Sequence, residues 1–421
     1  MGFRHPLFMT PLPEGWMVAT VDEIKAPERA SCVAGPFGSS ISSKYFADEG
    51  VPIIRGSNLT TDLTRFVPEG FAFVSPERAQ KYRSQHVQAG DLVFTCWGTL
   101  GQVGLIPSDG PYSKYIISNK QLKLRPDTSK TDSLFLFYYF ASPSMVQYIN
   151  TIAIGAAVPG INLGILKSLK VPLPPLAIQK KIASILSAYD DLIENNERRI
   201  RILEEMARNL YREWFVNFRF PGHEKVKMVD SPLGKIPEGW EKTQLFDIAT
   251  VKYGKGLPKK KLVEDGAYPV YGAAKIIGRY SEFTRKDRTI ICGCRGSVGE
   301  MQITLPECFV TNNSFTFDPA DPTAFFWLFH ALNERGLRDV IGGAAQPQIT
   351  LEGISSVELT LPPLSLLARF HKQVTAMYEQ AWVLEQKARI LRQTRDLLLP
   401  KLISGQLDVS ELDIEVPEEA A

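Results

Sequence analysis

Two long stretches of the chain carry hydrophobic residues at alternating three- and four-residue steps, which places one apolar stripe along an α-helix. The stripe of the first comprises Ile178, Ile182, Ile185, Tyr189, Leu192, Asn196, Leu203, Met206 and Leu210. The stripe of the second comprises Leu366, Phe370, Val374, Met377, Ala381, Leu384, Ala388 and Leu391. Such a helix can simply close the core of a domain. Because the pattern occurs twice, we expect the helices to pack together as an antiparallel coiled coil, with Asn196 fixing their register.

Shorter patterns in the rest of the chain predict strands and shorter helices. Strands are expected where β-branched and aromatic residues lie between turn residues, at Val51–Arg55, Asp91–Thr95, Gln121–Leu124, Thr289–Cys292 and Ser314–Phe317. Aromatic-rich helices are expected at Leu134–Asn150 and Thr323–Arg335. The expected fold class is α/β (α+β mixed), with mixed sheets and helices in each half of the chain.

Several short motifs occur once in each half, in the same order. Pro13-Glu14-Gly15-Trp16 returns as Pro237-Glu238-Gly239-Trp240, and Leu173-Pro174-Pro175-Leu176 returns as Leu361-Pro362-Pro363-Leu364. Between them, Gly155–Ile161 returns as Gly343–Ile349. The remaining sequence of the halves differs almost completely. This pattern indicates two related domains that recognise different targets, and we expect both tryptophans to lie in the domain cores.

These motifs divide the chain into six segments. The expected boundaries are a first domain at 1–175, a first spacer helix at 176–220, a linker at 221–235, a second domain at 236–363, a second spacer helix at 364–404 and a C-terminal tail at 405–421.

Composition limits the function classes without deciding among them. Of the 421 residues, 44% are hydrophobic and 22% are charged, and the net charge is +2, so nucleic-acid binding would need local basic patches. We find no apolar run of membrane-spanning length and no signal-peptide pattern near Met1, which favours a cytoplasmic protein. The five cysteines form no metal-ligand or disulfide pattern, so we expect no metal site.

Catalytic signatures are missing from the sequence. There is no Walker A loop, no glycine-rich cofactor turn followed by an acidic residue, and no Asn-Pro-Pro-aromatic tetrad. We therefore expect a binding protein that is not itself an enzyme.

If the chain binds nucleic acid, its polar and basic loop residues are candidates for contacts with phosphates and base edges. In the first domain these are Ser39, Ser40, Lys44, Tyr45, Arg55 and Asn58, and in the second they are Lys255, Lys259, Lys260, Lys261 and Arg279. A run such as Lys259–Lys261 is often only a solvated surface, and both interpretations stay open.

A second group of candidates lies in matched turns. Trp97-Gly98-Thr99-Leu100-Gly101 corresponds to Arg295-Gly296-Ser297-Val298-Gly299, so each turn carries a hydroxyl, Thr99 or Ser297, between two glycines. The glycines permit close backbone approach and the hydroxyl can donate to a phosphate, although a purely structural hairpin explains the pattern equally well. Turns containing Asn119, Asn312 and Asn313 are candidates for the same surface.

With its repeated motifs, the whole chain resembles the specificity subunit of a type I restriction-modification system. The resemblance rests on the doubled Pro-Glu-Gly-Trp and Leu-Pro-Pro-Leu motifs and on two characteristic helix endings, Leu210–Gly222 and Leu398–Leu407. It covers almost the entire length of the chain. The order and doubling of the motifs make the match specific, although each motif alone is weak.

The resemblance implies a DNA reader with two target-recognition domains separated by two long conserved helices. Each domain would bind one half of a bipartite, asymmetric site in double-stranded DNA, and the helices would fix the gap. Two modification subunits, with S-adenosylmethionine, and two restriction subunits, with ATP and Mg, would join the complex, so this chain would bind no cofactor. The alternatives are a self-contained methyltransferase or nuclease, which would need the missing catalytic motifs, and a structural adaptor that binds no DNA.

Overall fold

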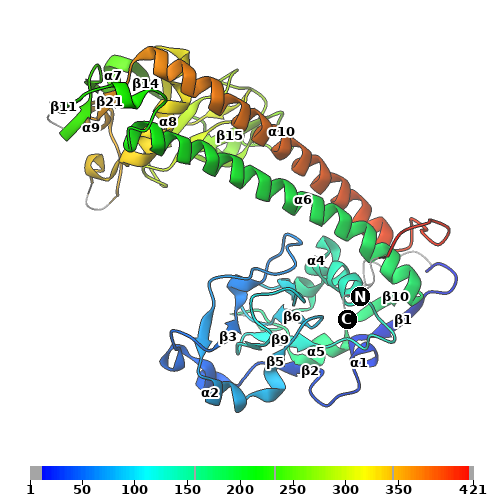
Figure 1. Ribbon diagram of the computed structural model, residues 1–421. Coiled ribbons are helices and arrows are strands. Elements are labelled where there is room, and N and C mark those ends of the chain that lie inside the picture. The colour runs from blue at the N-terminus through cyan, green and yellow to red at the C-terminus, as the bar shows by residue number, and fades with distance from the viewer. Residues whose placement is uncertain (1–11, 156–157, 232–233, 344–345, 417–421) are drawn as a thin grey trace. The chain divides into compact units, whose positions relative to one another are not determined.

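The computed structural model describes residues 12–155, 158–231, 234–343 and 346–416. The chain forms two compact units, residues 1–195 with 387–421, and residues 196–386. The first unit contains the start of one long helix and the end of the other, and the second unit contains the remaining parts (Figure 1). Each unit is described separately below.

The first unit is built on two four-stranded sheets. One is antiparallel, with the strand order β2-β9-β6-β7. The other has the order β4-β3-β8-β5 and contains a parallel pair, β3 with β8. The strands are β2 (Cys32–Ala34), β3 (Val51–Ile54), β4 (Ala72–Val74), β5 (His86–Val87), β6 (Leu92–Thr95), β7 (Val103–Leu105), β8 (Tyr115–Ile117) and β9 (Gln121–Leu124).

The second unit repeats this plan with one strand fewer. Its antiparallel sheet has the order β14-β20-β17-β18, and its smaller sheet has the order β16-β15-β19, again with a parallel pair, β15 with β19. The strands are β14 (Ala249–Tyr253), β15 (Tyr268–Gly272), β16 (Lys275–Tyr280), β17 (Ile290–Gly293), β18 (Met301–Ile303), β19 (Phe309–Val310) and β20 (Ser314–Pro319). The repeated motifs of the sequence therefore reflect a repeated topology, and the mixed α/β prediction is confirmed.

The repeated motifs at the two ends of each domain meet in a short antiparallel ladder. In the first unit β1 (Met17–Thr20), after the first Pro-Glu-Gly-Trp, pairs with β10 (Lys170–Leu173). In the second unit β13 (Glu241–Gln244) pairs with β21 (Glu358–Leu361) in the same way. A long helix starts directly after each ladder, because the Pro-Pro step ends the strand and precedes the first helical turn. The linker region adds a hairpin of β11 (Met228–Ser231) and β12 (Gly234–Pro237).

The aromatic segment predicted as one helix at Leu134–Asn150 is two helices, so that prediction is wrong in detail. Helix α3 (Ser133–Ala141) ends at Ser142, whose hydroxyl then caps α4 (Pro143–Ile152). Pro143 at the first position of α4 lacks the amide hydrogen that would continue α3. In the second unit a 3-10 turn precedes α8 (Phe325–Arg335), which lies within the predicted range.

Both aromatic helices cover the antiparallel sheet of their own unit. The α3 side chains pack against the β6 and β9 residues in the first core, where the ring centroids of Phe94 and Phe140 lie 5.1 Å apart. The α8 residues Phe326 and Trp327 pack into the second core with Phe315 and Phe317. The remaining short helices are α1 (Val21–Ile24), α2 (Pro76–Gln80), α5 (Leu163–Ser168), α7 (Leu245–Ile248) and α9 (Leu351–Ser355).

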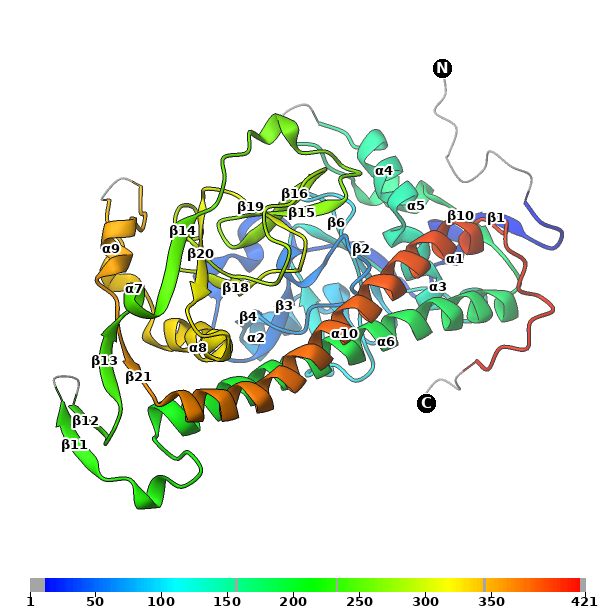
Figure 2. The same cartoon turned by 90° about the horizontal axis from the view of Figure 1, so that it is seen from above.

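The two predicted spacer helices are α6 (Leu176–Tyr211) and α10 (Leu364–Ile403). They run side by side in both views (Figures 1 and 2). In the first unit Ile182 and Leu186 of α6 share a core with Leu399 and Leu402 of α10. In the second unit the later α6 residue Tyr211 packs against the early α10 residue Phe370, so the helices are antiparallel.

The apolar stripe of α6 differs from the predicted one by one residue at two places. Leu192 and Met206 are 51% and 48% exposed, whereas their neighbours Ile193 and Ala207 are buried. A run of three- and four-residue steps can pass through either neighbour, and only the packing partner selects one of them. Asn196 lies on the buried side, at 9% exposure.

The first long helix also ends earlier than the predicted residue 220. Regular helix stops at Tyr211, a π-helical turn follows at Arg212–Val216, and Phe218 has a positive φ of 57°. The wider turn directs Trp214 and Phe215 into the second core.

The tryptophan of each Pro-Glu-Gly-Trp motif contacts the segment that follows the other domain's helix. In the second unit the Trp240 ring lies 5.3–5.9 Å from those of Phe215, Phe218 and Phe220, which follow α6. In the first unit a Cβ on Gly405, just after α10, would come within 3.2 Å of Trp16 and 2.4 Å of Pro13. Trp240 is buried and Trp16 packs partly buried against the first core, as predicted.

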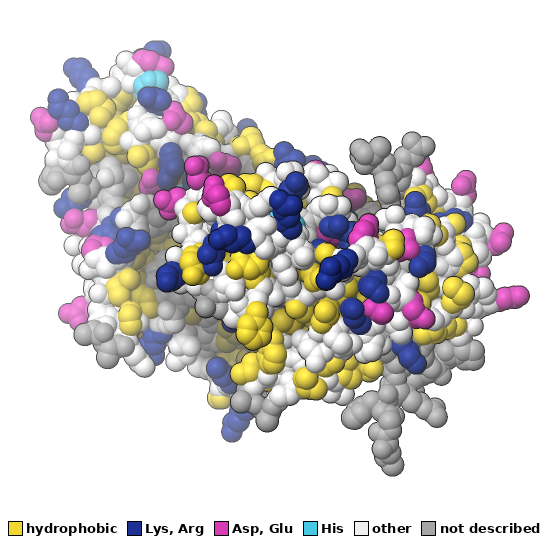
Figure 3. Space-filling model, turned by 90° about the horizontal axis from the view of Figure 1, so that it is seen from below, with side chains coloured by type: hydrophobic (Ala, Val, Ile, Leu, Met, Phe, Trp, Pro, Cys, Tyr) yellow, Lys and Arg dark blue, Asp and Glu magenta, His cyan; other side chains and the backbone are white. Residues whose placement is uncertain are grey.

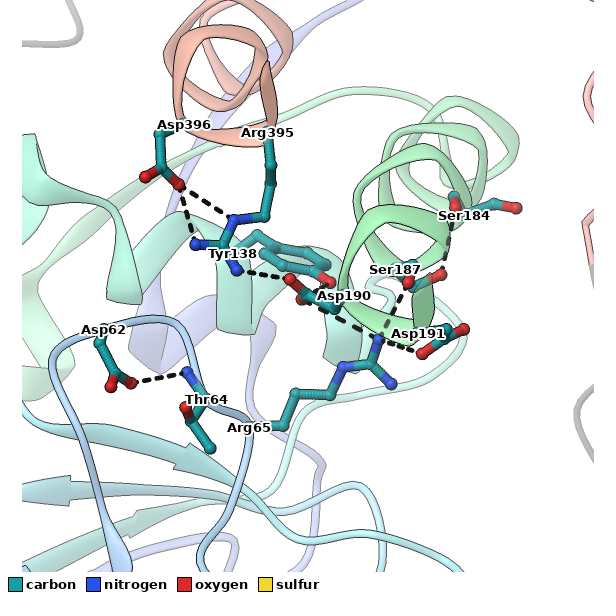
Figure 4. A network of polar contacts seen from close by, with 10 residues as sticks. All are labelled: Asp62, Thr64, Arg65, Tyr138, Ser184, Ser187, Asp190, Asp191, Arg395 and Asp396. Carbon is teal, nitrogen blue, oxygen red and sulfur yellow. Dashed lines mark hydrogen bonds and ion pairs between the residues drawn. The ribbon is translucent and has the colours of Figure 1, made fainter. Parts of the chain in front are cut away.

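A largely buried polar network in the first unit joins α10, α6, α3 and the loop before Phe66 (Figure 4). Arg395 Nη1 donates to Asp190 Oδ1 at 2.6 Å, and their side chains are 8% and 13% exposed. The Tyr138 hydroxyl donates to Asp190 Oδ2 at 2.5 Å. Burial, reinforced by the Asp190 carboxylate, raises the pKa of Tyr138, so the phenol remains a donor. Arg65 Nη2 reaches Asp191 Oδ1 at 2.9 Å.

No helix in the described part of the chain combines the length and hydrophobicity that a membrane span requires.

Replacing Arg395 with leucine should destabilise the first unit strongly. The change removes the nearer cation of the largely buried Asp190 carboxylate and leaves only Arg65, whose Nη2 lies 4.0 Å from Asp190 Oδ2. Breaking a buried ion pair typically costs about 3–5 kcal/mol. Urea unfolding would measure the loss, and hydrogen exchange of α3 and α6 would locate it. The double variant R395L/D190N should recover part of the stability because the buried Asp190 carboxylate is then also removed. The control is Lys401→Ala on an exposed side of α10; equal stability of R395L and K401A would contradict the prediction.

Stability of the second unit should fall as the pH is lowered from about 6.5 to 4. Burial, helped by nearby Arg208, lowers the pKa of His330 to about 4, and its Nε2 lies 3.2 Å from the Tyr378 hydroxyl. In that pH window the unfolded chain binds a proton that the folded unit does not. The free energy of unfolding therefore falls by on the order of 3 kcal/mol as the pH drops across the window. Urea unfolding of His330→Gln should show a smaller slope with pH. Asn333→Gln, at an exposed position of the same helix, changes no titratable group and should keep the wild-type slope.

Candidate nucleic-acid interface

Three loops come together at one end of the antiparallel sheet in the first unit. The turn 97–101 joins β6 to β7, the turn 118–120 joins β8 to β9, and the segment around Gly160 precedes α5. Backbone hydrogen bonds tie them together: Ile161 N donates to Cys96 O at 3.0 Å and Cys96 N donates to Lys120 O at 2.8 Å. Trp97 and Gly160 form an isolated antiparallel bridge.

The second unit repeats this arrangement bond for bond. Ile349 N donates to Cys294 O at 3.0 Å, and Cys294 N donates to Asn313 O at 2.9 Å. Here the isolated bridge joins Arg295 to Gln348. Trp97 and Arg295 therefore occupy equivalent backbone positions, as expected from the matched turns. The intervening residues 156–157 and 344–345 of the repeated Gly-Ala-Ala motif lie outside the described residues.

The backbone conformation of the matched turns requires glycine at two positions in each turn. Gly98 and Gly101 have φ values of 102° and 85°, and Gly296 and Gly299 have 83° and 82°, a region that side chains disfavour. Space is also restricted, since a Cβ on Gly101 would lie 2.5 Å from Val146. The turns thus have a structural role whether or not they touch a ligand.

A cavity of about 560 Å³ opens beside these loops in the first unit. Four residues predicted from the sequence line it: Arg55, Trp97, Thr99 and Asn119. The other lining residues are Ile41, Phe46, Ile53, Gly56, Thr95, Gly98, Gln102, Ser118, Lys120 and Gln121. The loops bring the four predicted residues together although they span more than sixty positions of sequence.

Some of the polar groups that line this cavity already make hydrogen bonds within the protein. Arg55 donates through Nη2 to Gly70 O at 3.0 Å, but its buried Nε has no hydrogen-bond partner among the described residues. Asn119 Nδ2 donates to Gly38 O at 3.1 Å. Trp97 is 42% exposed, which is unusual for a side chain of its size and leaves much of the indole available.

Gln102 and Asn58 hold the cavity wall in place. Gln102 Nε2 donates to the carbonyls of Gly56 and Leu59 at 3.0 and 2.9 Å. Asn58 is fully buried and bonded to Val67 O, Glu69 O and Arg55 N, so it holds the loop together, and its contact with DNA stays a prediction. Sequence reasoning missed Gln102, although its place directly after the glycine turn was a usable signal.

The serine- and lysine-rich loop forms two 3-10 turns, Gly38–Ile41 and Ser43–Tyr45. The Arg78 guanidinium lies 3.1 Å from the centroid of the Tyr45 ring and donates to Ser40 O at 2.6 Å, so both residues support the loop. Lys44 is exposed, with Nζ 5.7 Å from the Tyr45 ring. The side chain of Ser39 is outside the described part of the structure.

In the second unit the lysine run is a 3-10 turn, Lys259–Lys261, and all three side chains are exposed. Lys255, Asn312 and Asn313 are exposed as well, and Ser297 is half-buried. Arg279 is different, because it donates to the carbonyls of Gly266 and Ala267 at 2.5 and 2.6 Å. These bonds hold its guanidinium against the backbone of its own unit, and its contact with DNA stays a prediction.

Basic side chains on the face shown in Figure 3 are interspersed with acidic and apolar ones. This distribution agrees with the small net charge of +2 and leaves recognition to local groups.

The described residues contain no group of three or more potential metal ligands, and all five cysteines are buried and unpaired. Burial raises the pKa of the Cys32 and Cys96 thiols to about 11 and that of Cys292 to about 12, which disfavours the thiolate needed for metal binding.

Comparison with known proteins agrees with this organisation. The family model described as the type I restriction modification DNA specificity domain matches residues 36–205 and 237–375, one match in each half. The type I restriction enzyme MjaIX specificity subunit of Methanocaldococcus jannaschii is 24% identical over 95% of both chains. The HindI specificity subunit of Haemophilus influenzae is 21% identical over 71% of this chain and 83% of its own.

A solved structure shares the fold. The crystal structure of a type I restriction-modification S subunit from M. genitalium aligns with a TM-score of 0.59 at 18% identity, covering 95% of this chain and 99% of that chain. The family model covers most of the sequence, and apart from β1 and β2, which precede the first match, the duplicated strands of the two domains fall within its two matched segments. The chain therefore belongs to the type I restriction modification DNA specificity domain family.

Proposed function

We propose that this chain is the DNA sequence-specificity subunit of a type I restriction-modification complex, and that each recognition domain binds one half of a bipartite, asymmetric site. The observation that carries the proposal is the repeated loop arrangement. Equivalent backbone positions, held by equivalent hydrogen bonds, present Trp97 in one unit and Arg295 in the other. Two copies of one scaffold with different side chains suit a protein that reads two different half-sites of double-stranded DNA.

The paired helices would dock the partner subunits and set the gap between half-sites. In support, each unit exposes large apolar side chains on its part of the helices, where a lone protein would normally carry polar ones. They are Leu192, Ile390 and Leu397 in the first unit, and Ile202, Met206 and Val383 in the second. Two such surfaces fit two copies of a modification subunit, with two restriction subunits joining that assembly in the cytoplasm.

The chain itself would be non-catalytic. Chemistry would come from the partners, with S-adenosylmethionine bound by the modification subunits and ATP with Mg bound by the restriction subunits. The proposal is supported by the missing catalytic motifs and by the commitment of most buried polar groups in the loops to structural hydrogen bonds.

Exchanging residues 236–363 for the corresponding segment of another specificity protein should change one half of the methylated sequence and leave the other half intact. The ladder of β13 with β21 closes this segment, so the exchange preserves the boundary of the domain. Methylated adenines would be mapped across the genome of cells that carry the chain and its modification subunits. The reciprocal exchange of residues 1–175 is the control and should alter only the other half. A change in both halves from one exchange would contradict the modular function, and unchanged methylation without the chain would refute the function altogether.

Replacing Lys259, Lys260 and Lys261 together with alanine should weaken binding to all DNA sequences by a similar factor. Exposed lysines at phosphates act through counterion release, so the slope of log affinity against log salt should fall by up to about 2.7 for three lost contacts. Fluorescence anisotropy at several salt concentrations would measure the slope.

The matched control removes three exposed lysines from the hairpin region of the same unit, Lys225, Lys227 and Lys235. The hairpin of β11 and β12 lies apart from β15 and β16 in both ribbon views (Figures 1 and 2). Equal slopes for the two triple variants would show that Lys259–Lys261 is only a solvated surface.

A further inference from the structure

The two residues paired across the repeated isolated β-bridge differ between the units. In the first unit the pair is Trp97 with Gly160, and in the second it is Arg295 with Gln348. We propose that Arg295, oriented by Gln348, reads a guanine in the half-site of the second domain, and that the Trp97–Gly160 pair makes an uncharged contact at the equivalent place in the first. This inference rests on the proposed function and assigns the residue that determines specificity within it.

Backbone hydrogen bonds anchor the chain next to Arg295 and at Gln348. Cys294, directly before Arg295, donates to Asn313 O and accepts from Ile349 N, while Gln348 exchanges two backbone bonds with Gly342 at 2.8 and 2.9 Å. A reading side chain must be held in place to discriminate bases, and this loop bridge supplies that restraint.

Within each pair, one residue determines what the other can be. A Cβ on Gly160 would lie 2.6 Å from Trp97 Cε3, so the indole needs a glycine across the bridge. In the second unit no such ring is present, and Gln348 Oε1 accepts a hydrogen bond from Arg295 Nε at 3.3 Å. The exposed guanidinium is thereby oriented while Nη1 and Nη2 make no hydrogen bond to a described residue.

The free edge of Arg295 matches one base in particular. Guanine presents two acceptors, O6 and N7, in the major groove, and two guanidinium N–H groups bind them together. Lysine cannot reproduce this planar, two-point contact. The acidic residue that directly follows the turn, Glu300, is paired with Lys275 Nζ at 3.2 Å, which reduces its repulsion of DNA. The indole of Trp97, by contrast, carries no charge and suits an apolar contact such as a thymine methyl group.

Binding of the full chain, in complex with its modification subunits, to duplexes carrying 7-deazaguanine would test the inference. 7-Deazaguanine differs from guanine only in lacking the N7 acceptor. Each guanine in the half-site that the domain at residues 236–363 recognises would be replaced by it in turn. The wild-type complex should lose affinity at one guanine, within the roughly 5- to 150-fold range of a good base contact. Arg295→Ala should bind normal and substituted duplexes equally, and Arg295→Lys should not restore discrimination.

The methylated sequence gives an independent readout. Arg295→Ala should relax that one guanine position, Gln348→Ala should relax the same position less, and Lys260→Ala should leave the sequence unchanged while reducing overall methylation. Thermal unfolding of the variants would confirm that they fold. If no single guanine is sensitive, or if Arg295→Ala keeps the full sequence preference, this inference is wrong although the proposed function stands. If the wild-type complex shows no sequence preference at all, the proposed function fails first.

Discussion

Burial of the apolar stripes of α6 and α10 against each other is the interaction on which the rest of the structure depends. The contact is made in two parts: Ile182 and Leu186 meet Leu399 and Leu402 within the first unit, and Tyr211 meets Phe370 within the second. Each part also closes the core of a recognition domain, because the same clusters contain the residues of α3 or α8. The helices are therefore structural members of both domains, and their hydrophobic burial stabilises the domains as well as the coiled coil.

Polar groups at the two helix–domain junctions make the packing specific. In the first unit Asp190 is held between Arg395 and Tyr138, so a single carboxylate connects α6, α10 and α3. In the second unit the uncharged His330 and Tyr378 take the corresponding place between α8 and α10. A fully partnered buried charge tolerates few alternative registers, since any shift leaves it unpaired at a high energetic cost.

In the recognition loops the backbone is the same in both units, whereas the exposed side chains differ. Glycine turns, the backbone bonds of Cys96 and Cys294, and the ladders at the domain ends are the same in both units. Side chains mounted on them differ, as Trp97 and Arg295 show. A backbone that obtains its stability from its own hydrogen bonds can exchange such exposed side chains at little cost to folding.

The sequence by itself determined the duplicated plan, the two long helices, most of the strands and the equivalence of Trp97 and Arg295, because these follow from local periodicity and from repeated motifs. Only the tertiary structure decided that Ile193 and Ala207, rather than Leu192 and Met206, face the partner helix. It also showed which candidate side chains already make hydrogen bonds within the protein. Asn58 and Arg279 were predicted to contact DNA, and both donate to backbone carbonyls of their own unit. The physical reason is that hydrogen-bond partners and burial come from residues distant in sequence, which local pattern does not specify.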